Sequence, residues 1–325
     1  MTQPSILLLS GLPASGKTTY ALNWLAEEPD QRVRVNYDEL RVQMFGGWRR
    51  LEWKELKLLK LAAFATASEA LKAQKAVIID NTNLTPKARN AWSVLAQQYG
   101  VPYEEHEIDT SVSECVRRDR LREGKARVGR AVLERMALFN GWIDWTDYGG
   151  EFVICDVDGT LADCSHRLKH IQKDWCANCQ RSVSRLVLAD GGNGDCATCH
   201  GPVRDAKDWD AFFAACTDDT PIRPIVRLVD EHFSHYNLLI VSGRSVDQCG
   251  IATEEWLALS GIHPLHLFMR GGPHDHRPDY EVKQEILDLL PKDRIAYVID
   301  DRPQVLRMWQ ANGLTTLAVG NLKEF

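Results

Sequence analysis

The stretch FVICDVDGTLADC, residues 152–164, decides the fold of the second half of this sequence. The apolar run from Phe152 to Cys155 predicts a strand that begins an α/β unit. Two carboxylates, Asp156 and Asp158, follow at the end of this strand. Because residues i and i+2 point to the same side of an extended chain, we expect both carboxylates to meet one Mg²⁺ ion and one phosphate group.

Further motifs with the same chemistry follow at the ends of later strands. They are VSGR with Ser242, Gly243 and Arg244 for phosphate oxygens, EVKQEI with Lys283 to offset charge, and VIDDR with Asp300 and Asp301 for the metal. Thr160 of DVDGT is another candidate for phosphate binding. In this set Asp156 would attack phosphorus as the nucleophile, and Asp158 would act first as an acid and then as a base.

A second motif lies near the start of the chain. GLPASGKTT, residues 11–19, fits the phosphate-binding pattern G-x-x-x-x-G-K-[ST] between a predicted strand and a predicted helix. The candidate nucleotide-binding residues are Gly11, Ser15, Gly16, Lys17, Thr18 and Thr19. The glycines let backbone N–H groups turn toward phosphate oxygens, Lys17 reaches the β- and γ-phosphates, and the Thr18 hydroxyl binds Mg²⁺. The pattern therefore predicts a site for ATP.

The segment NYDELR, residues 36–41, supplies a candidate acceptor site. Asp38 and Arg41 are spaced i and i+3, which places them on one helix face. A kinase needs a carboxylate to orient or deprotonate the acceptor hydroxyl and a cation to hold the acceptor. An ordinary surface ion pair would show the same spacing.

The basic segment CVRRDRLREGKARVGR, residues 115–130, is a candidate lid over the triphosphate. If it is helical, Arg118 and Arg122 lie on one face at spacing i, i+4 and stabilise the charge of the transferring phosphate. A solvated, charged helix face is the alternative.

The pattern of apolar runs predicts two α/β domains. Strands are expected at Ile6–Leu9, Arg32–Asn36, Ala76–Asp80, Phe152–Cys155, Leu238–Val241 and Ala296–Ile299, and helices at Lys17–Leu25 and Leu51–Leu71. The segment NGWIDWTDYGG, residues 140–150, has turn formers and no clear period. We therefore place a P-loop domain with a parallel sheet at residues 1–149 and a second α/β domain at residues 150–325.

The second domain is interrupted by a cysteine-containing insert at about residues 174–206. Cys176, Cys179, Cys196 and Cys199 form two C-x-x-C pairs with the spacing of a zinc ribbon. The segment DGGNGD, residues 190–195, is the turn that such a ribbon needs, and the insert is expected to be neither helix nor regular strand. Disulfides, unliganded thiols and a ligand role for His200 are the alternatives. A contact of Arg181, Arg185 or Arg204 with nucleic acid also stays open.

Composition narrows the class of protein. The 325 residues are 44% apolar and 26% charged, which is ordinary for a globular protein, and no run is long enough for a membrane span. The first strand starts too early for a signal peptide, so we expect a cytoplasmic location. Residues 1–149 carry 21 Lys and Arg against 19 Asp and Glu, and the remainder 18 against 26. This acidic total argues against a bulk electrostatic DNA binder.

Taken together, the motifs resemble those of two known groups of proteins. The second domain resembles phosphatases of the haloacid dehalogenase type, and the whole chain, apart from the insert, resembles the bacteriophage bifunctional polynucleotide 5′-kinase/3′-phosphatases. By this resemblance Asp38 is the general base, Arg41 contacts the substrate phosphate, and Arg118 and Arg122 are the lid arginines. Arg167 matches an arginine of the phosphatase pocket.

Other positions are also carried over from this resemblance. Asp279 with Lys283 matches the D-x-x-x-K pattern of the family. In IIDNTN the family's aspartate position holds Asn81, with Asp80 just before it, so the role of that carboxylate is open. The family uses ATP and Mg²⁺, acts on DNA or RNA ends, including 2′,3′-cyclic phosphate ends, acts together with a ligase, and includes homo-oligomers. Zinc in the insert would be structural.

Two other functions remain compatible with the residues. A small-metabolite kinase/phosphatase would toggle one substrate in both directions. A nucleotide-gated nucleic-acid binding module would use the second domain as a scaffold, although a scaffold has no need of the second carboxylate at Asp158. The motifs favour an enzyme that adds phosphate to 5′-hydroxyl ends and removes it from 3′-phosphate ends.

Overall fold

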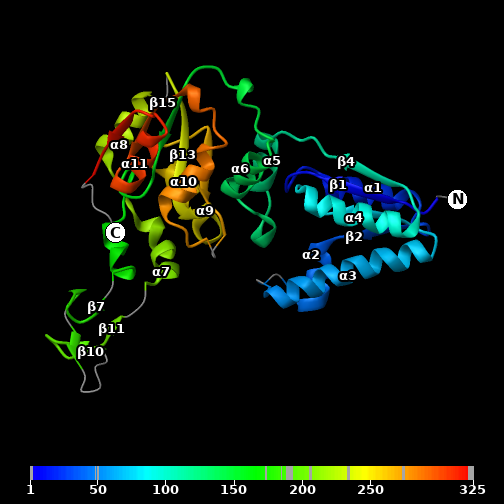
Figure 1. Cartoon of the computed structure of the whole chain (residues 1–325), viewed down its shortest axis with the longest axis horizontal. Coiled ribbons are helices and arrows are strands. Elements are labelled where there is room, and N and C mark those ends of the chain that lie inside the picture. The colour runs from blue at the N-terminus through cyan, green and yellow to red at the C-terminus, as the bar shows by residue number, and fades with distance from the viewer. Residues whose placement is uncertain are drawn as a thin grey trace. The chain divides into compact units, whose positions relative to one another are not determined.

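The computed structural model describes residues 3–47, 49, 51–172, 174–183, 185–187, 193–204, 207–232, 235–272 and 275–320. The chain forms two compact units. The first contains Met1–Gly129 and Met136–Ile143, and the second contains Arg130–Arg135 and Asp144–Phe325. Figure 1 shows the elements of each unit by residue number. Among the described residues, no helix combines the length and the apolar character needed to span a membrane.

The first unit is built on a parallel four-stranded sheet in the order β2-β3-β1-β4. Its strands are β1 Ile6–Ser10, β2 Arg32–Val35, β3 Ala76–Asp80 and β4 Tyr103–Glu107. Its helices are α1 Lys17–Glu27, α2 Tyr37–Phe45, α3 Trp53–Lys72, α4 Pro86–Tyr99 and α5 Val112–Arg120. All residues of β3 are buried, which fits a central strand covered by helices on both faces.

Local capping explains where the helices of this unit begin. The Asn36 side chain accepts hydrogen bonds from the backbone N–H groups of Asp38 and Glu39, so α2 starts directly after β2. Thr85 caps α4 in the same way, with a proline in the first turn. Apolar residues of α3 and α4 pack with β1 and β3, and the Phe64 and Trp92 rings stack at 4.1 Å. These contacts fix the helices that follow each strand.

The second unit has a parallel five-stranded sheet in the order β14-β13-β5-β15-β16. Its strands are β5 Phe152–Cys155, β13 Asn237–Ser245, β14 His266–Arg270, β15 Ile295–Asp300 and β16 Thr316–Ala318, and a small pair is formed by β6 Ala162–Asp163 and β12 Thr220–Pro221. The helices are α7 Trp209–Ala214, α8 Arg223–His232, α9 Val246–Leu259, α10 Asp279–Leu287 and α11 Pro303–Ala311.

Helix α6, Arg130–Phe139, begins against the edge of this second sheet. The Glu134 carboxylate accepts a hydrogen bond from the Leu267 N–H group at 2.6 Å and lies 3.2 Å from the His266 ring. Arg130 donates to the Pro264 carbonyl at 2.8 Å and to the Leu265 carbonyl at 2.5 Å. These bonds cover part of edge strand β14, whose backbone groups would otherwise be open to pairing.

The expected strands agree with the observed ones to within a few residues at each end, and the long helix expected at Leu51–Leu71 is α3. The insert differs from expectation, because it contains short antiparallel strands. They are β7 Trp175–Cys176, β8 Arg181–Ser182, β9 Arg185–Val187, β10 Asn193–Cys196 and β11 Val203–Arg204. The interpretation of this segment as neither helix nor strand is therefore wrong. Part of the turn expected at residues 190–195 lies outside the described residues.

Candidate active sites

The phosphate-binding loop of the first unit runs from the end of β1 to the start of α1. Gly11 has φ +151°, and a Cβ atom there would lie 2.8 Å from the Ser15 hydroxyl oxygen. Gly16 has φ +110°, a conformation that glycine adopts without strain. Thr18 and Thr19 are exposed in the first turn of α1. The six predicted loop residues thus form one backbone cradle at the N-terminus of a helix, where anions bind.

Lys17 is buried inside this loop. Its ammonium group donates hydrogen bonds to the carbonyls of Gly11 at 2.9 Å and Leu12 at 2.7 Å, and lies 3.3 Å from the Ser15 hydroxyl. Desolvation lowers the pKa of Lys17 to about 8, although the carboxylate of Asp80 acts in the opposite direction. The three oxygens that hold this buried cation are all neutral.

The loop after β3 supports the cradle. Asp80 and Asn81, the two positions considered for the family's aspartate, make different contacts there. The Gly11 N–H group donates to the Thr82 carbonyl at 3.1 Å, and the buried Asn83 amide donates to the Leu9 carbonyl at 2.7 Å. Asp80 is buried and pairs with the Arg34 guanidinium at 2.6 Å. The Asn81 side chain instead accepts a hydrogen bond from the Tyr37 N–H group at 2.9 Å. Asp80 therefore acts electrostatically on Lys17, whereas Asn81 anchors the start of α2.

Helix α2 carries the candidate acceptor residues beside the loop after β3. Asp38 and Arg41 lie in the first two turns, and Arg41 acts electrostatically on Asp38. Desolvation raises the pKa of Asp38, Arg41 lowers it, and Asp80 raises it further. A carboxylate with a raised pKa is a better proton acceptor than an ordinary one.

The structure places the two lid arginines differently. Arg118, on α5, donates to the Ser15 carbonyl of the loop at 3.1 Å and pairs with Glu114 at 2.7 Å. Helix α5 ends at Arg120, so Arg122 lies beyond it, and the expectation that both share one helical face is wrong. Arg122 lies 3.7 Å from the buried Asp119, whose carboxylate also accepts hydrogen bonds from the N–H groups of Val128 and Gly129. Asp119 thereby holds the segment that follows α5.

The second site lies at the carboxyl ends of β5, β13 and β15. The Lys283 ammonium, on α10, lies 2.8 Å from an oxygen of Asp156 and 2.8 Å from an oxygen of Asp300. It lies 3.5 Å from Asp279, one turn earlier on the same helix. Lys283, Asp156 and Asp300 are buried, and the Asp279 side chain is 9% exposed. Desolvation would lower the pKa of Lys283, but the three carboxylates raise it well above its ordinary value.

Three carboxylates form a group suited to a divalent cation. Asp156, Asp300 and Asp301 each offer an oxygen, and these oxygens lie within 4.8 Å of one another. Desolvation and, after it, the charge of Asp300 raise the pKa of Asp301 to about 6. Oxygen donors in such a cluster match the ligand preference of Mg²⁺. The carboxylate of Asp158, which the sequence places on the same ion, is not part of this group.

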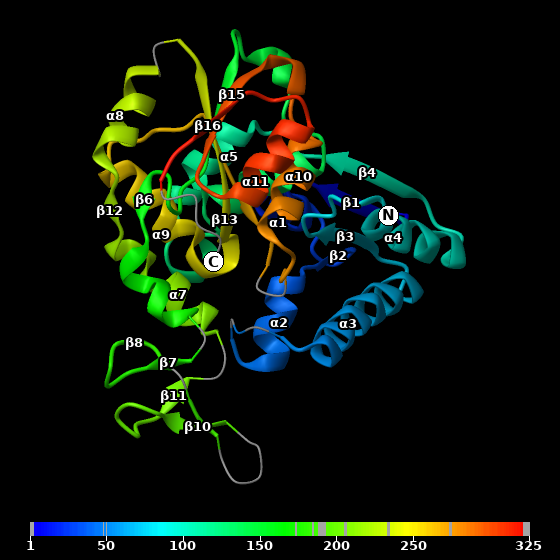
Figure 2. The same cartoon turned by 60° about the vertical axis from the view of Figure 1, so that its left-hand side comes forward.

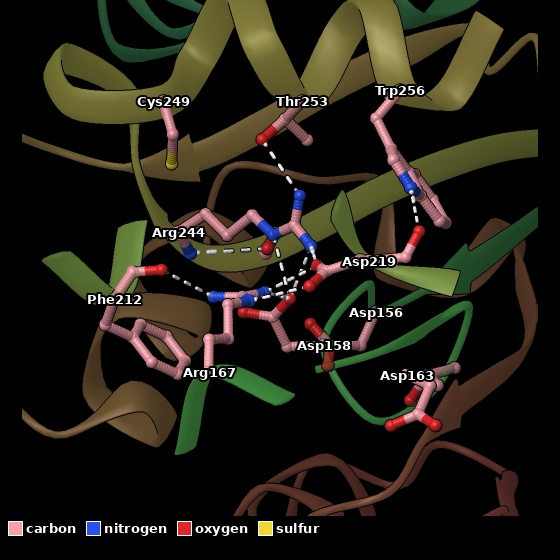
Figure 3. A network of polar contacts seen from close by, with 12 residues as sticks. Asp156, Asp158, Asp163, Arg167, Phe212, Asp219, Arg244, Cys249, Thr253 and Trp256 are labelled. Atoms are coloured by element: carbon pink, nitrogen blue, oxygen red, sulfur yellow. Dashed lines mark hydrogen bonds and ion pairs between the residues drawn. The ribbon is translucent and has the colours of Figure 1, made fainter. Parts of the chain in front are cut away.

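Asp158 instead joins a buried network of two arginines and a second aspartate, shown in Figure 3. One of its oxygens lies 2.5 Å from the Arg167 guanidinium and 2.6 Å from that of Arg244. Both arginines also pair with Asp219. Desolvation would raise the pKa of Asp158, but Arg244 and Arg167 lower it to about 2. The network holds Asp158 next to the nucleophile position and fixes both guanidinium groups.

Two glycines of the motifs are required by close contacts. A Cβ atom at Gly159 would lie 2.1 Å from an oxygen of Asp301, and one at Gly243 would lie 2.1 Å from an oxygen of Asp279. Ser242 and Thr160 are buried beside these glycines, and the Thr160 hydroxyl lies 3.5 Å from Asp301. At both motifs DVDGT and SGR, the neighbouring carboxylate of Asp301 or Asp279 therefore leaves no room for a Cβ atom.

Asp279 is held by cations in addition to Lys283. Arg270 lies 3.3 Å from one of its oxygens and Arg302 lies 3.4 Å from the other. Desolvation would raise the pKa of Asp279, but Lys283, Arg302 and Arg270 lower it. Asp279 therefore positions Lys283 and remains charged.

The four cysteines of the insert come together as a third group. Their sulfur atoms lie within 4.8 Å of one another, with 3.4 Å between Cys176 and Cys199 and 3.8 Å between Cys179 and Cys196. These distances exceed the roughly 2.05 Å of a disulfide bond and approach the separation of about 3.8 Å that Zn–S bonds of about 2.3 Å give in a tetrahedron. The backbone N–H groups of Cys179 and Thr198 point at Cys176 and Cys196, which favours thiolates. The donor set fits zinc.

Several residues that build these sites carry no signal in the sequence. Asp219 and Asp119 are buried aspartates outside any recognisable motif, and Arg270 belongs to an edge strand. Phe212 packs under the Arg167 guanidinium at 4.1 Å. The spacing of TDDTP or RRDRL predicts none of these contacts. The side chains of Arg185 and Arg204 lie outside the described residues.

Comparison with protein-family models matches each half of the chain. Residues 6–139 match the AAA domain, and residues 194–323 match the phosphatase domain of the polynucleotide kinase PNKP. The second match includes the end of the insert and every candidate phosphatase residue after it. The motifs before residue 194, including Asp156 and Asp158, lie outside this match.

Two relatives are named as proteins that combine a polynucleotide kinase with a second activity. A putative bifunctional polynucleotide kinase/RNA ligase of Autographa californica nuclear polyhedrosis virus is 25% identical over 94% of this chain. A bifunctional polynucleotide phosphatase/kinase of Schizosaccharomyces pombe is 34% identical over 30% of this chain. The chain covers 41% of the viral protein and 19% of the yeast protein, less than half of either. A solved Pnkp1/Rnl/Hen1 RNA repair complex contains a chain of 23% identity, covered over 98% of its length, with a TM-score of 0.40.

Proposed function

We propose that this chain, whose residues 6–139 belong to the AAA domain family and whose residues 194–323 belong to the polynucleotide kinase phosphatase family, heals nucleic-acid ends. It transfers the γ-phosphate of ATP to 5′-hydroxyl ends of DNA or RNA and hydrolyses 3′-phosphate ends. Its products have the 5′-phosphate and 3′-hydroxyl that a ligase joins. One observation carries the proposal: Lys17 with Arg118 and Lys283 with Asp156 form two separate phosphate-handling centres on one chain.

In the kinase reaction Lys17 and the backbone of the loop hold the β- and γ-phosphates. Thr18, next to Lys17, and the buried Asp80 would hold Mg²⁺, which would neutralise phosphate charge during transfer. Arg118 already contacts the loop, and Arg122 lies close enough to lower the pKa of Lys17. These cations face the negative charge that spreads over the transferring phosphoryl group.

The acceptor hydroxyl is proposed to bind at α2. The Asp38 carboxylate accepts the proton of the 5′-hydroxyl as its oxygen attacks the γ-phosphorus, and ADP leaves. Arg41, one turn further along the helix, contacts the phosphate that follows the acceptor nucleoside. The hydrogen bond from Tyr37 to Asn81 fixes the direction of α2 and so positions both side chains.

In the phosphatase reaction an oxygen of Asp156 attacks the phosphorus of the 3′-phosphate. The two arginines keep Asp158 ionised in the free site, so its carboxylate takes up a proton when the phosphate anion binds beside it. Asp158 then gives this proton to the leaving 3′-oxygen, and it accepts one from the water that hydrolyses the acyl phosphate. Asp156, Asp300 and Asp301 would hold Mg²⁺, which would reduce the charge repulsion between the phosphate and the nucleophile. Ser242, Thr160 and Lys283 bind phosphate oxygens, and Arg167 and Arg244 orient Asp158.

The insert is proposed to bind one zinc ion with a structural role. Four thiolates occupy the whole tetrahedron, so no position remains for a water ligand or a substrate. An insert of about 30 residues is too short for an apolar core that would fold it alone, and a metal supplies that stability. His200, next to Cys199, is not needed as a ligand.

A single experiment tests both activities. An oligonucleotide with a 5′-hydroxyl and a 3′-phosphate, labelled at an internal position, is incubated with ATP and Mg²⁺, and both ends are analysed. We expect gain of a 5′-phosphate and loss of the 3′-phosphate. If sugar phosphates are phosphorylated or dephosphorylated efficiently and the oligonucleotide is unchanged, the chain is a small-metabolite enzyme and the proposal is wrong.

A further inference from the structure

Helix α3 presents an exposed face that the kinase chemistry above does not use. Trp53, in its first turn, is 73% exposed, and Leu61 is 59% exposed two turns later. The spacing i, i+4, i+8 puts Trp53, Lys57 and Leu61 on one side of the helix, with the exposed Lys54 and Lys60 at its borders. We call these five residues the α3 face.

The α3 face is not the side of the helix that packs in the protein. Leu59 and Ala63, on another side of α3, are the residues of this part of the helix that are buried in the first unit. A tryptophan ring that stays mostly in water adds little burial free energy to the stability of the fold. The Lys57 ammonium lies 5.6 Å from the centroid of this ring, within the range of a cation–π contact.

The N-terminal end of α3 lies next to the helix that carries the candidate acceptor residues. Asp38, Arg41 and Phe45 repeat at i, i+3 and i+7 along α2, so they share one side of that helix over about 10 Å. The Arg49 guanidinium lies 5.5 Å from the Phe45 ring and pairs with Glu55 of α3. Figure 2 shows α2 next to the N-terminal end of α3. These contacts place Trp53, in the first turn of α3, on a helix that adjoins the one carrying Asp38.

We propose that the α3 face is a stacking platform for the single-stranded nucleic acid whose 5′-hydroxyl is phosphorylated at Asp38. A base stacks on Trp53, and Lys54, Lys57 and Lys60 contact the phosphates on either side of it. This inference rests on the kinase activity proposed above. It adds that the enzyme holds nucleotides beyond the acceptor and prefers single-stranded 5′ ends, because only unpaired bases have free faces for stacking.

Charge distinguishes this occupant from a second copy of the chain. A two-fold interface through the α3 face would bring three lysines against the same three lysines, and like charges in contact are unfavourable. The acidic neighbours do not offset them, because Glu55 is paired with Arg49 and Glu52 caps the helix. A polyanion with flat, apolar bases complements both properties of the face.

The test compares acceptors that differ only in length. Phosphorylation of a dinucleotide and of a single strand of about twelve nucleotides, both with 3′-hydroxyl ends, is measured for the wild type and for Trp53→Ala, Trp53→Phe and Trp53→Leu. We expect Trp53→Ala and Trp53→Leu to raise KM for the long strand about 5- to 100-fold, with little change for the dinucleotide. Trp53→Phe should retain most of the affinity. Val94→Ala, at an exposed apolar position on α4, serves as the control and should change neither acceptor.

Two further measurements complete the test. Replacing Lys54, Lys57 and Lys60 together by glutamine should reduce the slope of log KM against log salt by about 0.7 for each phosphate that the lysines neutralise in the wild type. If the wild type is a dimer and Trp53→Ala dissociates it, or if Trp53→Leu keeps the dimer intact, a second copy of the chain covers the α3 face. Either result would show that the proposed stacking platform is wrong. Unchanged KM for the long strand would also overturn it. Failure of the wild type to phosphorylate any nucleic acid would instead reject the kinase proposal.

Discussion

The ammonium group of Lys283 lies 2.8 Å from Asp156 and is the cation closest to the proposed nucleophile among the described residues. The same group lies 2.8 Å from Asp300, one of the proposed metal ligands. A single buried lysine therefore balances the charge of the nucleophile and of the metal site together. Because desolvation makes each uncompensated buried charge costly, this lysine matters for folding as well as for phosphate binding.

Lys283→Met should destabilise the second unit strongly. It leaves Asp156, Asp300 and Asp279 without their shared cation, and removing one partner of a buried ionic group typically costs about 3–5 kcal/mol. Thermal unfolding should show the loss, and added Mg²⁺ should restore part of it. Lys292→Met removes an exposed pair with Asp288 and should cost less than about 1 kcal/mol. Equal effects of both substitutions would contradict the proposed charge balance.

The two activities should be separable. Lys17→Ala removes the fixed cation at the transferring phosphate, a kind of interaction commonly worth about 10²–10³ in rate, and should abolish 5′-phosphorylation while 3′-phosphate removal survives. Asp156→Asn should do the opposite, because it removes the nucleophile. Each variant is the folding control for the other. Loss of both activities in a folded variant would disprove the two-site interpretation.

The acceptor residues should affect different kinetic constants. Asp38→Ala is expected to lower mainly kcat, since proton acceptance matters in the transition state. Arg41→Ala is expected to raise KM for the acceptor more than KM for ATP. Gln43→Ala, at an exposed position of the same helix, should change neither constant. If both variants lose ATP affinity equally, the two residues have structural roles.

Asp219 should act as a positioning residue for the phosphatase. It pairs with Arg167 and Arg244, so Asp219→Asn weakens the hold on both guanidinium groups that orient Asp158. We expect lower phosphatase kcat with a smaller change in KM, a changed pH profile and an unchanged kinase. The neighbouring Asp218 is exposed, and Asp218→Asn should leave all three readouts as in the wild type. A loss of stability with normal kcat would show that Asp219 serves only the fold.

Cys176→Ser should release zinc and impair the phosphatase more than the kinase. If the insert serves substrate capture, small phosphate esters should still be hydrolysed while 3′-phosphate oligonucleotides are not. His200→Asn should keep the metal, because four thiolates already complete the tetrahedron. Metal analysis of protein purified without chelator, with the expected result of one zinc per chain, checks the premise. Absence of zinc, or a disulfide between these cysteines, would reject it.

The sequence predicts the two sheets and most site residues because the informative motifs stand directly after apolar strands. Parallel strands bring their carboxyl ends to one edge, so Asp156, Ser242 and Asp300 meet without any knowledge of the helices. The glycines of the motifs add a second signal, since Gly159 and Gly243 have no room for a side chain. The candidate set of the second unit follows from these two regularities.

The remaining features depend on contacts that sequence spacing does not encode. An extended chain would bring Asp158 to the metal, but this residue lies in a turn after β5 and its side chain meets two arginines instead. The basic pattern predicts a helix through Arg122, yet α5 ends at Arg120. Asp219 reaches Arg167 across 52 positions of sequence. Each of these three features depends on tertiary packing, which a local sequence pattern does not predict.

The hydrogen bond from the Asp208 N–H group to the His170 carbonyl, at 2.8 Å, joins the two ends of the cysteine-containing insert. This bond holds His170 and Asp208 together at the base of the insert. The sheet of the second unit therefore does not depend on the length or sequence of the chain between these two residues. The insert can thus be exchanged as a module, and homologous chains could gain, lose or replace it without refitting the sheet beneath. Replacing residues 174–206 by a brief glycine–serine bridge should leave the five strands and their charged centre intact, and hydrolysis of small phosphate esters should survive.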